Sequence, residues 1–216
     1  MTPSLIRPAN ERGAILEAAT ILRKGGLVVF PTDTVYGVGA YALLPEAIEA
    51  IYRAKLRPRD KAIPLLLSHI SEINGVARNI PDIAWAIAER FWPGGLTLVL
   101  WKASHLPDIL CAGGESIAVR VPDHPVALAL IAALDGPLAA TSANLSGDAP
   151  AITAEEAAAV LGGQVAMILD GGKAPMGVAS TVLDLTVSPP RILRQGAIAA
   201  DMLAGFLARF GLQLAS

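Results

Sequence analysis

The sequence predicts a single α/β domain built on an open, twisted, mixed sheet with flanking helices. The chain has 216 residues, enough for one domain with a large core. Its residues are 53% hydrophobic and only 17% charged, which disfavours disordered segments. Apolar runs of strand length alternate along the chain with helix-length segments that carry one apolar stripe. This alternation indicates an α/β fold.

Local signals set the bounds of the elements in the first half of the chain. Asn10 is expected to cap a helix that ends at Gly25, and Pro45 to begin another, because these residue types favour those helix positions. Pro31 stops an unbroken apolar run that predicts a buried strand. The predicted helices cover residues 10–24, 45–52, 71–76 and 81–91. The predicted strands are 27–30, a short strand ending at residue 43, and 63–67.

The second half continues the same alternation. Thr153 and Glu156 have the spacing of a capping box, which places a helix start between them. The closing segment carries an apolar stripe at helical spacing. The predicted strands are 96–101, 117–121, 138–140, 165–169, 181–185 and 191–193. The predicted helices are 125–134, 153–162 and 202–210.

Composition excludes several classes of protein. The longest apolar stretches, such as 126–134, fall well short of the roughly 18 to 20 residues that a membrane-spanning helix needs. The N-terminal residues lack the apolar run of a secretory signal, so the chain is expected to be soluble and cytoplasmic. The single cysteine, Cys111, fits a reducing compartment. A formal net charge of −2 disfavours a protein that coats nucleic acid, so any anion site has to be local.

Common catalytic and cofactor motifs are missing from the sequence. The three histidines, His69, His105 and His124, stand singly and lack the spacing of zinc ligands. No nucleophile elbow or Walker-type phosphate loop is present. Residues 37–42 match the dinucleotide pattern only nominally, because the next helix is expected to begin at Pro45 and not within the motif.

A row of cations is the strongest polar feature. Five lie within nine residues, with Asp60 as the only carboxylate: Arg53, Lys55, Arg57, Arg59 and Lys61. In an extended segment, spacing by two points side chains the same way. Such a row suits a polyphosphate, because lysine offers a point charge and arginine a fork that matches phosphate oxygens. Composition alone supports a solvated basic loop equally well.

Two further features have a functional and a structural interpretation. Residues 141–147 place hydroxyls and the amide of Asn144 where a buried strand ends, a position that suits a ligand or a turn that satisfies its own backbone. Arg120 interrupts the apolar run 117–121. A buried arginine needs a partner, so it pairs either with a carboxylate of the chain or with a ligand carboxylate.

Seven stretches occur in a fixed order over about residues 10–200. They are 25–37 (GGLVVFPTDTVYG), 55–58 (KLRP), 91–98 (FWPGGLTL), 116–122 (SIAVRVP), 141–144 (TSAN), 180–183 (STVL) and 193–196 (LRQG). Taken together they resemble the YrdC-like threonylcarbamoyl-AMP synthases of the short (TsaC) type. Each stretch is weak alone, and the order of all seven is highly specific.

The resemblance implies an enzyme that condenses L-threonine, bicarbonate or CO2, and ATP into L-threonylcarbamoyl-adenylate, with release of pyrophosphate. The product feeds tRNA threonylcarbamoyladenosine modification by downstream proteins. The implied fold has a concave, positively charged cavity, and Mg2+ arrives on ATP without a protein metal site. By motif match, ATP is held by Lys55, Arg57, Ser116, Ser142, Asn144 and Arg194, with Lys55 and Arg57 as catalytic residues. Threonine is held by Thr32, Arg120 and Ser180, with Arg120 pairing its carboxylate.

The match implies one YrdC-like domain over residues 1–216, without the extra C-terminal domain of the longer synthases. The sequence departs from the family after Pro58, where the loop is longer, and at Ser68, which stands where relatives often have histidine. Lys61 is given no role. Two alternatives are a non-catalytic RNA-binding protein of the same fold, and a domain that activates carbamoyl phosphate in hydrogenase maturation. The second alternative requires zinc-finger and acylphosphatase-like segments, for which this chain has no room.

Overall fold

The fold is an open mixed α/β sheet flanked by helices, as the sequence predicts. The computed structural model describes residues 5–215, so residues 1–4 and 216 of the predicted domain lie outside the described part. The strands are β1 Leu5–Pro8, β2 Val28–Phe30, β3 Gly37–Tyr41, β4 Leu65–Leu66, β5 Ala77–Arg78, β6 Leu96–Lys102, β7 Ser116–Arg120, β8 Leu138–Ser142, β9 Met167–Asp170, β10 Thr181–Asp184 and β11 Arg191–Arg194. The helices are α1 Ala14–Arg23, α2 Pro45–Ala54, α3 Ile73–Val76, α4 Asp82–Phe91, α5 Pro125–Leu134, α6 Ala154–Leu161 and α7 Ala200–Ala208, with 3-10 turns at Ile70–Glu72 and Asp108–Cys111.

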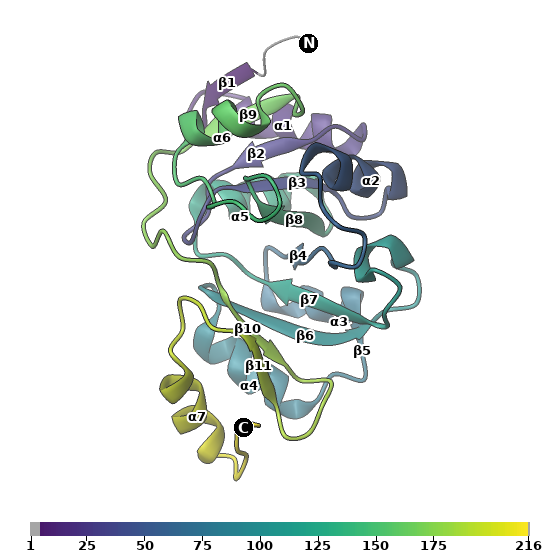
Figure 1. The fold of residues 1–216 in the computed structure, drawn as a ribbon, viewed down its shortest axis with the longest axis vertical. Helices are drawn as coiled ribbons and strands as arrows, with labels where there is room; N and C mark the ends of the chain where they lie inside the picture. Colours follow the sequence, from purple (N-terminus) through teal and green to yellow (C-terminus); the bar gives the residue numbers. More distant parts are fainter. Residues whose placement is uncertain (1–4, 216) are drawn as a thin grey trace.

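These strands form one sheet in the order β1-β9-β2-β3-β8-β4-β7-β6-β10-β11, and β5 pairs with β6. The pairs β1/β9, β2/β9, β4/β7 and β6/β10 are parallel, and the others are antiparallel. Figure 1 shows the strands stacked along the long axis of the molecule, with α1 and α6 at the β1 end and α4 and α7 at the β11 end. None of the helices in the described part of the chain is long and apolar enough to cross a membrane.

Alternation along the central strands separates a buried core from a polar face. Leu96, Leu98 and Leu100 of β6 belong to the larger hydrophobic core, whereas Thr97 and Val99 between them line a cavity. Strand β7 follows the same rule, because Ile117 and Val119 enter the core while the other three residues of the strand, Ser116, Ala118 and Arg120, line the cavity. A second core cluster packs α1 and α5 against β2 and β9. The cavity therefore lies over one face of the central strands.

Three local predictions differ from the structure. Asn10 does not cap α1, because the helix begins later, after Gly13, which adopts a left-handed conformation with φ 86°. The strand predicted over 63–67 pairs only at Leu65–Leu66. The cation row is not one extended segment, because α2 continues to Ala54. Strands β1 and β5 were not among the predicted elements.

Candidate active site

The polar face of the sheet carries a cavity of about 420 Å³. Segments far apart in the sequence line it, from the β2–β3 loop to β11. Its polar lining consists of Thr32, Thr34, Tyr36, Arg57, Thr97, Ser116, Arg120, Thr141, Ser142, Ser180 and Arg194, with no aspartate or glutamate. Seven of the nine residues assigned to the site from the sequence are therefore brought together here, and Lys55 and Asn144 lie behind the lining.

The β2–β3 loop, residues 31–36, is held together by the hydroxyl of Thr32. This hydroxyl donates to the Val35 carbonyl at 2.6 Å and accepts from the backbone N–H groups of Thr34 and Val35, each at 3.2 Å. A hydroxyl has one proton, so that of Thr32 is already used within the loop. The neighbouring Thr34 hydroxyl instead faces Arg120, from which it accepts a hydrogen bond at 2.9 Å.

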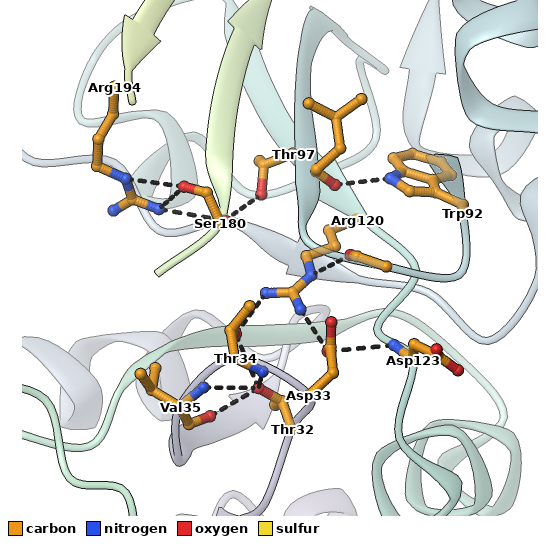
Figure 2. A network of polar contacts seen from close by, with 12 residues as sticks. Thr32, Asp33, Thr34, Val35, Trp92, Thr97, Arg120, Asp123, Ser180 and Arg194 are labelled. Carbon is orange, nitrogen blue, oxygen red and sulfur yellow. Dashed lines mark hydrogen bonds and ion pairs between the residues drawn. The ribbon is translucent and has the colours of Figure 1, made fainter. Parts of the chain in front are cut away.

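Arg120 forms a buried ion pair with Asp33, as Figure 2 shows. The Arg120 side chain is 7% exposed and that of Asp33 is 3% exposed. The Nε of Arg120 donates to the Gly94 carbonyl at 2.8 Å, and this bond fixes the plane of the guanidinium. A Cβ atom at position 94 would lie 2.6 Å from the Phe91 carbonyl oxygen, so glycine is needed where these two backbone segments approach each other. The sequence left open whether Arg120 pairs with a carboxylate of the chain, and the structure supplies Asp33.

Three of the five N–H bonds of Arg120 are used by Gly94, Thr34 and Asp33, and two remain for a ligand. Asp33 also accepts from the backbone N–H of Asp123 at 3.1 Å through the same oxygen, Oδ1. Among the described residues, its other oxygen, Oδ2, is buried without a hydrogen-bond partner. The pair therefore neutralises much of the Arg120 charge and keeps donors free.

The end of α2 turns Arg57 toward the cavity. Leu56 occupies the left-handed position after the helix, with φ 50°, where glycine is usual. The N–H of Arg57 bonds the Tyr52 carbonyl at 2.9 Å and that of Leu56 bonds the Arg53 carbonyl at 3.3 Å, which is the Schellman pattern. The guanidinium of Arg57 donates to the carbonyls of Lys61 and Ala62, at 3.1 and 2.6 Å, so the loop after Pro58 positions it.

Lys55 does not reach the cavity surface. It is 1% exposed, and its ammonium donates to the carbonyls of Ser142 and Asn144, each at 2.5 Å, and to Asn144 Oδ1 at 2.9 Å. An ammonium has three donors, and all three are used. Burial, and secondarily the charge of Arg57, lower the pKa of Lys55 to about 7. The three oxygen acceptors act in the opposite direction, because they stabilise the charged form.

The remaining cations of the row lie away from the cavity. Arg53 is exposed on α2, and Lys61 is exposed in the following loop. Arg59 pairs with Glu49 on the surface. Only Arg57 of the five therefore lines the site, because the helix end and the strained turn send Lys55 and Arg57 in different directions.

The turn after β8 continues the network. Ser142 Oγ donates to Asn144 Oδ1 at 2.6 Å, and Asn144 Nδ2 donates to the Asp148 carbonyl at 2.7 Å. The N–H of Ser146 donates to the Lys55 carbonyl at 3.0 Å. Lys55 and Asn144 thus hold the turn, while Ser142 faces the cavity.

Arg194 and Ser180 meet on the opposite wall. Arg194 donates to the Ser180 carbonyl through Nε at 3.1 Å and Nη2 at 2.8 Å, and through Nη2 to Ser180 Oγ at 3.1 Å. Figure 2 shows Thr97 on the other side of Ser180. Burial lowers the pKa of the Arg57, Arg120 and Arg194 guanidinium groups, and the charge of Arg194 lowers the pKa of the other two further. The three arginines act on one another through their charges, and no acidic residue of the lining offsets them. This arrangement suits an anionic ligand.

The sequence analysis missed Asp33, Thr34 and Thr97. Asp33 and Thr34 stand beside Thr32 in the quoted stretch 25–37, and the buried Arg120 is a signal that a carboxylate has to be near. Thr97 carried a weaker signal, as a hydroxyl inside an apolar strand. Within residues 5–215, no group of three or more histidine, cysteine, aspartate or glutamate side chains is placed to hold a metal ion.

Comparison with known proteins gives consistent matches. The family model Sua5_yciO_yrdC, described as "Telomere recombination", matches residues 20–196. A relative from Pyrococcus abyssi named threonylcarbamoyl-AMP synthase is 42% identical over 193 residues, 89% of this chain and 57% of that protein. A Bacillus subtilis protein of the same name is 44% identical over 88% of this chain and 55% of its own length. This chain therefore spans a little over half the length of these two relatives.

Three further matches differ in the share of the other protein that they cover. A Mycobacterium tuberculosis protein named putative threonylcarbamoyl-AMP synthase is 39% identical over 93% of this chain and 92% of its own length. The crystal structure of P. abyssi Sua5 complexed with L-threonine superposes with a TM-score of 0.91 at 38% identity, covering 100% of this chain and 62% of that one. Escherichia coli YciO superposes with a TM-score of 0.82 at 29% identity, over 92% and 97% of the chains.

Proposed function

The chain belongs to the Sua5/YciO/YrdC family, and from that membership we propose that it is an L-threonylcarbamoyladenylate synthase. The reaction joins L-threonine, bicarbonate or CO2, and ATP, and it yields threonylcarbamoyl-AMP and pyrophosphate, for use by proteins that modify tRNA. The observation that carries the proposal is the cavity in which Arg57, Arg120 and Arg194 face a common space. Two acidic substrates, a nucleoside triphosphate and an amino acid carboxylate, fit those charges.

The ATP subsite lies between Arg57 and Arg194. Ser142 and Ser116 add hydroxyls to the lining of the cavity. Guanidinium forks match phosphate oxygens, and hydroxyls supply short neutral hydrogen bonds. Lys55 and Asn144 act on this subsite through the turn they hold, so they are positioning residues and not phosphate ligands.

The threonine subsite lies around Arg120. Its two remaining N–H bonds receive the substrate carboxylate, while Thr34 and Ser180 stand beside it. Thr32 contributes indirectly, because its proton is committed to the Val35 carbonyl. This arrangement revises the direct role expected for Thr32 and adds Thr34 to the site.

The chemistry needs no side-chain nucleophile. The threonine amine attacks the carbon of CO2 and loses a proton to give a carbamate, or it attacks bicarbonate and gives the same carbamate with release of water. A carbamate oxygen then attacks the α-phosphorus, the bond to the bridging oxygen of the β-phosphate breaks, and pyrophosphate leaves. The arginines hold the reactants together and stabilise the charge that builds on the phosphates.

Mg2+ is proposed to arrive on ATP. The side chains around the cavity agree with this, because the lining has no carboxylate and Asp33 behind it is paired with Arg120. Mg2+ keeps several waters and takes few protein ligands when it accompanies nucleotide phosphates. When bound, the ion neutralises phosphate charge and orients the leaving pyrophosphate.

Incubation with ATP, Mg2+, bicarbonate and each amino acid in turn, followed by mass analysis, tests the proposal. We expect the adenylate and pyrophosphate with threonine. Their absence would remove the proposed activity. A parallel mobility-shift assay with RNA and no ATP tests the non-catalytic alternative, which the names of the relatives do not favour.

A further inference from the structure

Thr97 is a polar residue in β6, a strand whose leucines belong to the hydrophobic core. Its neighbours Leu96 and Leu98 are fully buried in the larger core cluster. Thr97 points to the other face, lines the cavity and is 3% exposed. A buried hydroxyl costs free energy unless it has a hydrogen-bond partner. The partner of Thr97 therefore shows what the residue does.

That partner is Ser180, which lies just before β10. Thr97 Oγ1 and Ser180 Oγ are 2.8 Å apart, and either atom can donate. Ser180 Oγ also accepts from Arg194 Nη2 at 3.1 Å. Figure 2 shows the three side chains in a line, with Ser180 in the middle. Beta-strand pairing fixes the geometry, because Thr97 sits opposite Val182 in the parallel β6/β10 pair.

A count of protons shows what the pair offers to a ligand. Thr97 and Ser180 have one proton each, and the bond between them uses one. The bond from Arg194 uses a lone pair of Ser180 and supplies no acceptor. One O–H proton therefore remains for the cavity, whichever residue donates to the other.

Both arrangements suit a ligand that donates and accepts. If Thr97 donates to Ser180, both lone pairs of Ser180 are occupied, so Ser180 offers the free proton and Thr97 offers its lone pairs. If Ser180 donates to Thr97, the free proton belongs to Thr97, and each hydroxyl keeps one lone pair. Either arrangement therefore presents a donor and an acceptor on adjacent atoms. A ligand hydroxyl matches both arrangements, and a methyl group matches neither.

We propose that Thr97 is a specificity-determining residue that acts with Ser180 to select the hydroxyl of the amino acid substrate. The proposal rests on the proposed function, because it assumes that a β-hydroxy amino acid enters the cavity. Thr32 does not fill this role, since its proton is used within its own loop. A substrate with a methyl in place of the hydroxyl leaves the pair unsatisfied, and such sites reject the analogue strongly.

Calorimetric binding of L-threonine, L-valine and ATP to the whole chain and to Thr97→Val tests the proposal. Valine is nearly isosteric with threonine in both the ligand and the substitution. We expect Thr97→Val to weaken threonine binding about tenfold, the scale of one buried hydrogen bond, while valine binding stays the same or improves. ATP binding should not change. Thr97→Ser, which keeps the hydroxyl, should retain the preference for threonine.

A matched control is Thr186→Val, two residues beyond the end of β10, where the Thr186 hydroxyl donates to Asp184 at 2.6 Å. It should leave the threonine-to-valine ratio unchanged. If Thr97→Val folds poorly, Thr97→Cys, which keeps only a weak donor, should lower the ratio in the same direction. A wild-type protein that prefers threonine, with the same threonine-to-valine ratio in Thr97→Val and Thr97→Cys, would overturn this inference alone. A wild-type protein that does not bind threonine would overturn the proposed function and this inference with it.

Discussion

The ammonium of Lys55 donates hydrogen bonds to both the side-chain oxygen and the main-chain carbonyl of Asn144. The ammonium of Lys55 lies 2.9 Å from Asn144 Oδ1 and 2.5 Å from the Asn144 carbonyl oxygen. The residues come from the end of α2 and the turn after β8, which are 89 positions apart. A buried charge that binds the backbone of a distant turn fixes the position of that turn. Ser142, on the same turn, faces the cavity because Lys55 lies behind it.

Substitution of Lys55 and Arg57 should reduce turnover by different routes. We expect Lys55→Ala and Arg57→Ala each to lower turnover more than tenfold, because a hydrogen bond to a charged group contributes roughly 1.5 to 3 kcal/mol. Arg57→Ala should weaken ATP binding with little change in melting temperature. Lys55→Ala should also lower the melting temperature, since it removes the three hydrogen bonds that the buried ammonium makes to the turn after β8. Steady-state kinetics and thermal unfolding measure both effects.

Arg53→Ala is the matched control, because Arg53 belongs to the same cation row but is exposed on α2. Its turnover should equal that of the wild type. Full activity in Arg57→Ala would show that Arg57 does not hold the nucleotide.

The burial of the Lys55 amine should make the free energy of unfolding depend on pH. The pKa of Lys55 is lowered to about 7 in the folded chain, against 10.5 for the ordinary side chain. Between these values the unfolded chain binds a proton that the folded chain has released, so the free energy of unfolding rises with pH. Lys55→Met removes this contribution.

Urea unfolding of the wild type and Lys55→Met at pH 6.5, 8 and 9.5 measures this contribution of Lys55 to the free energy of unfolding. The free-energy difference, wild type minus variant, should grow as pH rises. A difference that stays constant would mean that the three acceptors keep Lys55 protonated throughout that range.

The turn after β8 should act on the nucleotide more than on the amino acid. Ser142→Ala removes a hydroxyl from the cavity lining, and Asn144→Ala removes an acceptor of both Lys55 and Ser142. Both variants should weaken ATP binding more than threonine binding in calorimetry. Unchanged ATP affinity in both variants would indicate a turn that only satisfies its own backbone.

The sequence predicted elements best where local signals and burial agree. The helix Pro125–Leu134 begins and ends where predicted, because Pro125 is favoured in a first turn and the apolar run has helix length. The cation row failed as a pattern, because Leu56 adopts the left-handed turn in place of glycine and separates Lys55 from Arg57. No property of residues 53–61 alone shows that Lys55 is to meet a turn 89 positions away. Long-range pairing decides such roles, and single-sequence patterns do not contain it.

The same reason explains the two threonines of the β2–β3 loop. Thr32 and Thr34 share a residue type and a loop, so a motif cannot say which hydroxyl contacts Arg120. The structure separates them, because Thr32 lies where its hydroxyl closes the turn on Val35 and Thr34 lies against Arg120. Both threonines line the cavity, but the motif does not resolve their individual contacts.

The Arg120–Asp33 pair should serve both stability and binding. Breaking a buried ion pair from one side leaves an uncompensated charge, so Asp33→Ala should lower the free energy of unfolding by about 3 to 5 kcal/mol. Arg120→Lys keeps the charge but loses the planar fork that reaches Gly94, Thr34 and Asp33. Threonine binding should weaken more than tenfold in Arg120→Lys, and ATP binding much less. Equal losses for both ligands would place Arg120 outside the amino acid subsite.

Amino acid choice in the wild-type protein should follow the order threonine, serine, valine. Serine keeps the hydroxyl and loses one methyl, which hydrophobic pockets reject by roughly 10- to 200-fold. Valine keeps the shape and loses the hydroxyl, so the polar groups around Ser180 are left unpaired, and discrimination can reach about 10⁴. Competition assays with the three amino acids give the order directly. Valine ahead of serine would mean that the pocket selects shape, and the assignment of Ser180 to the substrate hydroxyl would then be wrong.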